Sequence, residues 1–206
     1  MMGGRVIPFF IERGVGGDVV ARRFVWVERL AIPVMVVGLL AAVVLPSHPL
    51  AALLLVVAGG VHLFRTVGWY QRGVWANSLL WVLFIGYGWF ALSLLLMGLA
   101  QLGWFDPVIA LHAMTVGGVG VTTMGMMARV SLGHSGRVMQ AHPLTTIAFV
   151  LVVLAALMRV VGPLVAPAQT LLWIDASGLI WATAFLLFLI VYLPIYLRPR
   201  IDGRPG

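Results

Sequence analysis

Cysteine and lysine are both absent from this 206-residue sequence, and acidic residues number only six. Without cysteine the chain has no disulfide, no iron–sulfur cluster, no zinc ribbon and no thiolate ligand for a metal. Without lysine, all thirteen basic residues are arginines, so the net charge of +7 persists at any accessible pH. Charge in this chain is therefore scarce, and most of it is permanently positive.

Charged residues of all kinds make up only 9% of the chain, whereas 62% of the residues are hydrophobic. Soluble domains contain about 25% charged and about 45–50% apolar residues, so a soluble fold could not bury this much apolar surface. No phosphate-binding motif is present, which argues against a P-loop transporter, and nothing favours a soluble enzyme or a nucleic-acid-binding protein. We expect no cleavable signal peptide, because the first apolar run is long enough to span a bilayer. The composition is that of a membrane protein.

Six stretches reach the about 20 mostly apolar residues that a transmembrane helix requires. They are Phe24–Leu45, Leu50–Trp69, Ser78–Leu102, Pro107–Ala128, Pro143–Leu164 and Thr170–Leu197. Asp106 before Pro107 is typical of a helix N-cap followed by proline at the first helical position. We therefore predict an all-α integral membrane bundle of six helices over residues 24–197, with an N-terminal segment at 1–23 and a tail at 198–206.

The arginines predict the orientation of the bundle. All but one lie in the N-terminal region, the second and fourth connections and the C-terminal tail: Arg5, Arg13, Arg22, Arg23, Arg29, Arg65, Arg72, Arg129, Arg137, Arg198, Arg200 and Arg204. Only Arg159 falls on the other side. By the positive-inside rule, both termini lie in the cytoplasm.

Histidines within the spans are candidates for function, because an ionisable group inside a membrane helix is costly. His62 lies inside the second span, toward its cytoplasmic half, and His112 lies near the outer start of the fourth. His134 falls in the fourth, cytoplasmic connection. On an unbroken helix His112 and His134 would be about 33 Å apart, and His62 and His112 differ in depth by roughly 10 Å. No pair makes a convincing two-histidine haem site. His62 and His112 are each a ligand or an imidazole bonded to a neighbouring helix, and His134 is a ligand or a solvated or headgroup contact.

Other side chains leave both a packing and a cofactor interpretation open. In the fourth span, Gly117 and Thr115 belong to a run of small residues that lets a helix or a flat ligand approach the backbone. Four methionines on the same helix can fill apolar space or bind Cu(I). Deep aromatic residues of the third span can pack or wall a cofactor: Trp81, Tyr87 and Trp89. Three arginines near the cytoplasmic interface can hold haem propionates or lipid phosphates: Arg65, Arg129 and Arg137.

Four ordered segments resemble the NnrS family of membrane proteins. His112–Gly117 reads His-Ala-Met-Thr-Val-Gly, and Arg129–Arg137 reads Arg-Val-Ser-Leu-Gly-His-Ser-Gly-Arg. In the family, a His-Ala-x-Thr-Val-Gly helix leads into an Arg-x-x-Leu-Gly-His-Thr-Gly-Arg turn. Gly3–Phe10 and Leu80–Tyr87 also agree, so the similarity covers essentially the whole chain.

The resemblance implies a haem- and copper-containing protein of the bacterial inner membrane, linked to denitrification and to tolerance of nitric oxide stress. Haem would be b-type, since no Cys-x-x-Cys-His is present for covalent attachment. The positions that match the family motif are His112, Thr115, Gly117, Arg129, His134 and Arg137. His112 is the first candidate axial ligand and His62 the second. We expect haem-dependent redox or nitric oxide chemistry, with copper as a further candidate metal.

Two departures from the family bear on this expectation. Family members are longer and have more spans, and this chain resembles their C-terminal half. In addition, Phe84 stands where many members have histidine. A homodimer or a separately encoded subunit is then expected to supply the other half. The alternative is a helical membrane subunit or transporter-like protein without bound metal, whose histidines conduct protons or tune packing.

Overall fold

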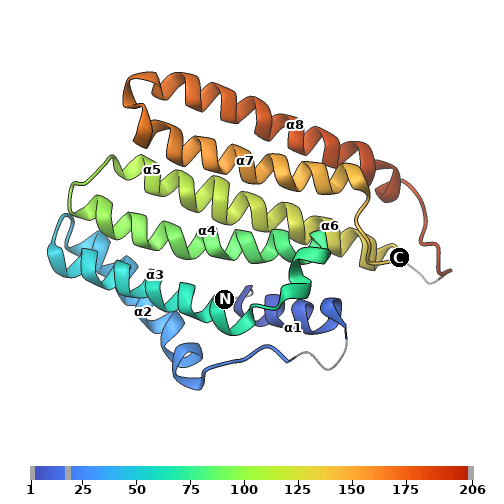
Figure 1. Ribbon diagram of the computed structural model, residues 1–206, viewed down its shortest axis with the longest axis horizontal. Helices are drawn as coiled ribbons and strands as arrows, with labels where there is room; N and C mark the ends of the chain where they lie inside the picture. The colour runs from blue at the N-terminus through green and yellow to red at the C-terminus, as the bar shows by residue number, and fades with distance from the viewer. Residues whose placement is uncertain (1–2, 17–19, 204–206) are drawn as a thin grey trace.

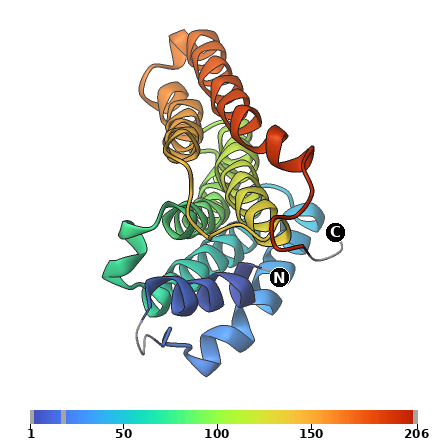
Figure 2. The same cartoon turned by 90° about the vertical axis from the view of Figure 1, so that its right-hand side faces the viewer.

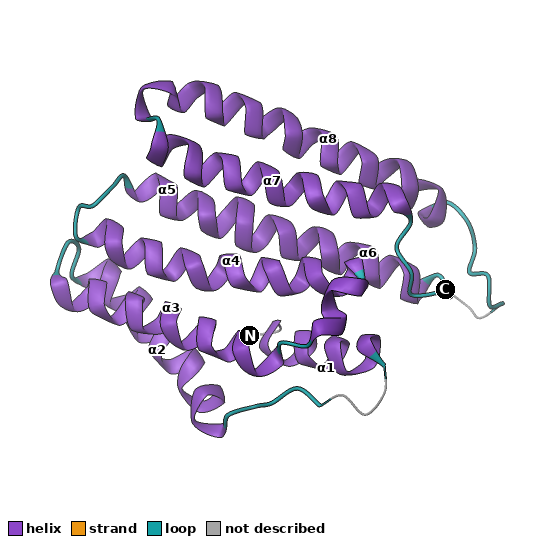
Figure 3. Ribbon diagram, viewed as in Figure 1, coloured by secondary structure: helices purple, strands orange, loops and turns teal. Residues whose placement is uncertain are grey.

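The computed structural model describes residues 3–16 and 20–203, and within these ranges the regular structure is entirely helical (Figures 1 and 3). Its elements are α1 (Gly3–Val15), α2 (Val25–Val44), α3 (Pro49–Trp69), α4 (Ser78–Gln101), α5 (Pro107–His112), a π-helical segment (Ala113–Val121), α6 (Thr122–His134), α7 (Pro143–Val165) and α8 (Thr170–Tyr196). Short 3₁₀ turns occupy Arg72–Ala76 and Pro167–Gln169.

Within the described residues, six helices are long and apolar enough to cross a membrane, which confirms the six predicted spans. The fourth span is one continuous helix made of α5, the π-helical segment (hereafter the π segment) and α6. It extends beyond the predicted end at Ala128, because the polar residues after it continue the helical hydrogen bonding. His134 is therefore the last residue of α6 rather than part of the connection.

Polar side chains at the helix starts explain several of the sequence signals. Asp106 caps α5 as predicted, since its Oδ1 accepts a hydrogen bond from Val108 N at 2.9 Å. His48 and His142 use Nδ1 in the same way at the starts of α3 and α7, each followed by proline. Two of the five histidines thus act as helix caps.

The six spans pack in the order α2, α3, α4, fourth span, α7, α8 (Figures 1 and 2). The most apolar window of α4 is 56% buried, whereas the corresponding windows of α2 and α8 are 17% buried. Because α2 and α8 are this exposed, their side chains are left to face lipid. Functional groups that need shelter must lie near α3, α4 and the fourth span.

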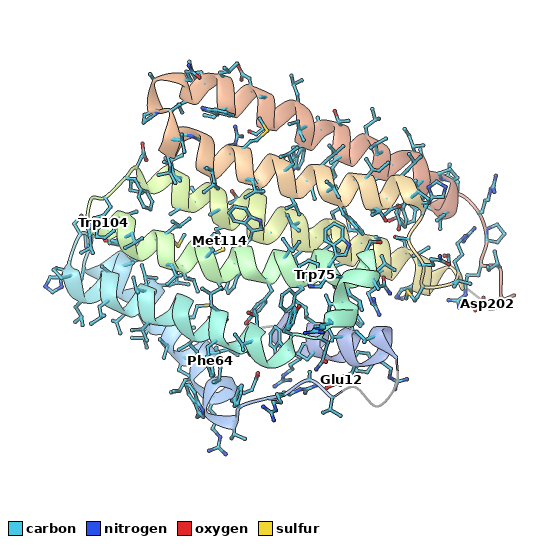
Figure 4. The ribbon with its side chains drawn as sticks, viewed as in Figure 1. Glu12, Phe64, Trp75, Trp104, Met114 and Asp202 are labelled. Carbon is cyan, nitrogen blue, oxygen red and sulfur yellow. The ribbon has the colours of Figure 1, made fainter. Side chains whose placement is uncertain are left out.

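The two ends of the bundle differ in chemistry. The end that carries α1, the α3–α4 and α6–α7 connections and the described part of the tail holds every described arginine except Arg159, and we call it the arginine-rich end. The opposite end carries the α2–α3, α4–α5 and α7–α8 connections. Figure 4 labels Trp104 at the opposite end and Asp202 at the arginine-rich end, with Met114 in the interior.

Helix α1 was not anticipated from the sequence, which was interpreted only as an N-terminal segment. It packs against α4 and buries Ile7, Pro8 and Ile11 on one face. Gly4 lies so close to Arg65 that a Cβ at this position would collide with the guanidinium group. The spacing of these residues at three and four positions was the available signal for an amphipathic helix.

Candidate functional site

The three candidate histidines of the spans line three different cavities. His62 borders a cavity of about 290 Å³, His112 one of about 440 Å³ and His134 one of about 530 Å³. His112 and His134 lie near opposite ends of one continuous helix, as predicted. Among the described residues, no three His, Cys, Asp or Glu side chains gather into a metal site. The structure therefore keeps these histidines apart.

A chain of hydrogen bonds surrounds His62 and joins four helices; we call Glu28, His62, Arg65 and Tyr87 the buried network. Arg65 Nε donates to Glu28 Oε1 at 2.7 Å, and Arg65 Nη2 pairs with the other carboxylate oxygen. Arg65 Nη1 donates to the Tyr87 hydroxyl at 3.1 Å, and Nη2 also reaches the carbonyl of Gly4 at 3.4 Å. A buried cation is thus neutralised and bonded entirely within the protein.

The same contacts determine the tautomer of His62. Its Nε2 lies 3.1 Å from the carbonyl oxygen of Ala31, which can only accept, so Nε2 carries the proton. Nδ1 lies 2.6 Å from the Tyr87 hydroxyl and therefore accepts from it. Both nitrogens are occupied, and the ring has no lone pair left for a metal. In this arrangement His62, the second candidate ligand, does not fit as a haem ligand.

The cavity beside the buried network lies where two of the family-like segments, Gly3–Phe10 and Leu80–Tyr87, meet. Its lining includes Gly3 and Gly4 of α1, His62 and Arg65 of α3, Tyr87 of α4, and Gly118 and Thr122 of the fourth span. Pockets for drug-sized ligands measure about 300–1,000 Å³, so about 290 Å³ suits a smaller molecule. Haem does not fit here, and Arg65, expected as a propionate partner, is already paired with Glu28.

Two further cavities follow one another between the fourth span, α7 and α8; we call them together the His112 groove. The first, near the opposite end, is lined by His112, Phe105, Pro163, Thr170, Ile174 and neighbours. The second, of about 490 Å³, is lined by Thr115, Gly120, Arg159, Ser177, Trp181, Phe185 and neighbours. Thr170 and Ile174 precede Ser177 and Trp181 along α8, so the groove runs along this helix from the opposite end inward.

The side chains of the His112 groove fit a flat, negatively substituted cofactor. His112 is half-buried, and no hydrogen bond to its ring is found among the described residues, so a ring nitrogen is available as a ligand. Arg159 Nη1 donates a hydrogen bond to the carbonyl oxygen of Ile174 at 3.0 Å, and Arg159 also borders the second cavity. Trp181 and Phe185 lie 4.2 Å apart between ring centroids and form an aromatic wall.

The π segment begins directly after His112 and contains the remaining residues of the histidine motif. Such segments are rare and are frequently found at functional sites, because the extra residue widens the helix. Within it, Thr115 faces the groove but donates its hydroxyl to the carbonyl of Leu111 at 2.9 Å. Gly117 instead lies against the ring of Trp89, where a Cβ would come within 2.6 Å. Gly117 therefore serves helix packing.

The third cavity, at the arginine-rich end, brings Arg129 and His134 together. It lies between α1 and α6 and also receives Met139 and Arg200 from outside the helices. Arg137 does not line it, although Arg137 Nη1 is buried without a hydrogen-bond partner. Two of the three matching residues of this motif thus share a pocket.

Comparisons with curated proteins and with solved structures find no match. The family model described as NnrS protein matches residues 1–200, which is nearly the whole chain and includes the residues that line the four cavities described above. Because this match covers more than half of the chain, the chain belongs to the NnrS family.

Proposed function

We propose that this chain is a haem b-binding protein of the bacterial inner membrane that handles nitric oxide or electrons, with His112 as an iron ligand. The observation that carries the proposal is the half-buried His112 ring, which has an uncommitted nitrogen, borders the groove and directly precedes the π segment. Membership of the NnrS family supports the same role. The absence of a Cys-x-x-Cys-His sequence makes the proposed haem non-covalent.

The residues of the groove have separate tasks in this proposal. His112 would donate a lone pair to the iron, Arg159 would hold a propionate by a charge-assisted hydrogen bond, and Trp181 with Phe185 would exclude water along one side. When bound, haem would supply the redox couple and the position at which a diatomic gas binds. Since His62 and His134 line other cavities, neither would bind the same iron, and a second protein ligand would have to come from a partner subunit. Such a partner is a second copy of this chain or a separately encoded subunit.

Copper fits less well than haem. No cluster of three His, Cys, Asp or Glu residues occurs in the described part of the chain, and Met124 is fully buried in the hydrophobic core. Met114 accepts a hydrogen bond from Ser93 and packs on the cluster of Leu55 and Leu94. We therefore assign no copper ligands.

The test is the reduced-minus-oxidised Soret spectrum of the purified protein, with iron and copper measured on the same sample. We expect His112→Ala to lose the haem signal, whereas His142→Asn, which removes an imidazole but keeps a capping side chain, retains it. Tryptophan fluorescence and gel filtration establish that both variants are folded. Unchanged haem content in folded His112→Ala would remove His112 from the role.

A membrane subunit without metal is the second candidate, and the buried network is the observation that favours it. Arg65 donates both to Glu28 and to Tyr87, and Tyr87 in turn donates to His62. Buried ionisable groups in membrane helices are functional candidates on their own. A purified wild-type protein that is colourless and contains neither iron nor copper would favour this function.

The proposed orientation places the arginine-rich end in the cytoplasm, by the positive-inside rule. Val138, in the α6–α7 connection, provides the test, because it is 79% exposed and a single cysteine introduced there is the only thiol in the chain. We expect Val138→Cys to react with a membrane-impermeant maleimide only after the cells are opened. Labelling in intact cells would reverse the assignment.

A further inference from the structure

The cavity between α1 and α6 at the arginine-rich end is lined by several positively charged side chains. Its lining contains three arginines, one histidine and several apolar residues: Phe9, Phe10, Arg13, Arg129, Val130, Gly133, His134, Met139 and Arg200. None of these residues is acidic. The cavity therefore concentrates positive charge beside an apolar wall.

Two neighbouring carboxylates are already paired with arginines, one of which, Arg200, itself lines the cavity. Asp202 accepts from Arg200 at 2.9 and 2.6 Å. Glu12, which adjoins Arg13 on α1, forms an ion pair with Arg23 at 3.3 Å. Arg13 and Arg129 thus have no ion pair within the described part of the chain.

Arg129 gives the clearest indication that a ligand is needed. Only 7% of its surface is exposed, and its buried Nε has no hydrogen-bond partner. Its guanidinium lies 3.8 Å from the centroid of the Phe10 ring, a contact that orients the group without neutralising it. Burying a charge in this way is costly unless an anion compensates it.

We propose that this cavity binds a phosphate group through Arg129 and Arg13. The planar guanidinium matches phosphate oxygens with two parallel hydrogen bonds. Phosphate can come from an anionic lipid headgroup or from a soluble anion. The site is separate from the His112 groove, so it stands whether or not haem binds there.

The position of the site favours the lipid source. Phe9, Val130 and Met139 are exposed apolar side chains around the arginines, at the end of the bundle where spans leave the membrane. They can contact the glycerol and upper acyl chain of a phospholipid, whereas a soluble phosphate has no apolar part for them to contact. Anionic lipid also adds the attraction of a charged membrane surface.

The experiment uses the full chain in nanodiscs of phosphatidylcholine alone or with phosphatidylglycerol, and native mass spectrometry counts the retained phosphatidylglycerol. We expect Arg129→Gln and Arg13→Gln each to weaken retention roughly tenfold, since each removes charge-assisted hydrogen bonds. Arg72→Gln is the matched control, because Arg72 is exposed at the same end and does not line the cavity. The thermal unfolding of each variant shows whether it is folded.

A second arm titrates inorganic phosphate into the phosphatidylcholine nanodiscs at constant ionic strength and measures the unfolding temperature. Stabilisation by phosphate that depends on Arg129 would identify a soluble ligand, and retention of phosphatidylglycerol alone would identify the lipid. The proposal is overturned if neither probe binds, or if both cavity variants bind like Arg72→Gln.

Discussion

Arg65 and Arg129 lie at the same end of the bundle and are equally buried, with 7% of each residue's surface exposed. Arg65 pairs with Glu28 and donates to Tyr87 and to the carbonyl of Gly4. Arg129 contacts the Phe10 ring and leaves Nε without a partner. Equal burial therefore has different consequences. The charge of Arg65 is neutralised by Glu28 within the protein, whereas neutralising the charge of Arg129 requires an anion from outside the chain.

The histidines repeat this contrast. His62 uses one nitrogen for Ala31 and the other for Tyr87, so its ring belongs to the internal structure. His112 is half-buried beside a groove and has no hydrogen bond to its ring within the described residues. A buried histidine in a membrane helix is thus not enough to identify a cofactor ligand, and its uncommitted nitrogen is the better criterion.

The largest effect is expected from Arg65→Met. The substitution leaves Glu28 without its cation and removes a donor from Tyr87, at a cost of about 3 kcal/mol or more in the free energy of unfolding. Titration of sodium dodecyl sulfate into mild detergent, followed by tryptophan fluorescence, measures the change. The double variant Glu28→Met with Arg65→Met should recover much of the loss, and a loss as large as that of the single variant would contradict the pairing argument.

Gly86→Ala tests how closely α4 approaches the fourth span behind the buried network. A Cβ at Gly86 would collide with Thr122 Oγ1 and lie 3.0 Å from the Thr122 backbone nitrogen, so we expect a loss of about 2 kcal/mol. Gly88 lies on the same helix with open space around it, and Gly88→Ala should be neutral or stabilising. Equal unfolding midpoints for the two variants would show that the helices separate easily here.

Tyr87→Phe removes one hydroxyl that joins His62 to Arg65. We expect a loss of about 1 kcal/mol, because hydrogen bonds between membrane helices are individually modest. The same unfolding titration applies. In this variant the His62 nitrogen that faces residue 87 becomes available, so any new metal-dependent absorbance would indicate that Tyr87 keeps the ring occupied.

Arg129→Met should have the smallest effect on stability, below about 1 kcal/mol in phosphatidylcholine. Loss of the ring contact is offset by removal of a buried charge without an anion. A loss as large as that of Arg65→Met would mean that Arg129 has a structural partner after all, and it would remove the contrast between the two arginines.

Several features could be predicted from the sequence because they depend on neighbouring residues. Long apolar runs predicted the six spans, and the Asp106–Pro107 pair predicted a capped helix start. Separation along one helix placed His112 and His134 near opposite ends. The buried network could not be found this way, because it depends on how α2, α3 and α4 are rotated about their axes. Glu28 and Arg65 are 37 residues apart, and no local pattern specifies that they face each other.

The amino-acid sequence alone determined the environment of this protein, since apolar runs and scarce charge have no stable alternative to lipid. It also determined the family, because the motifs that carry the resemblance are short runs of neighbouring residues. Only the tertiary structure decided which polar side chains are satisfied inside the bundle and which remain open. That distinction depends on distances of a few ångströms between helices, and it separates His62 and Arg65 from His112 and Arg129.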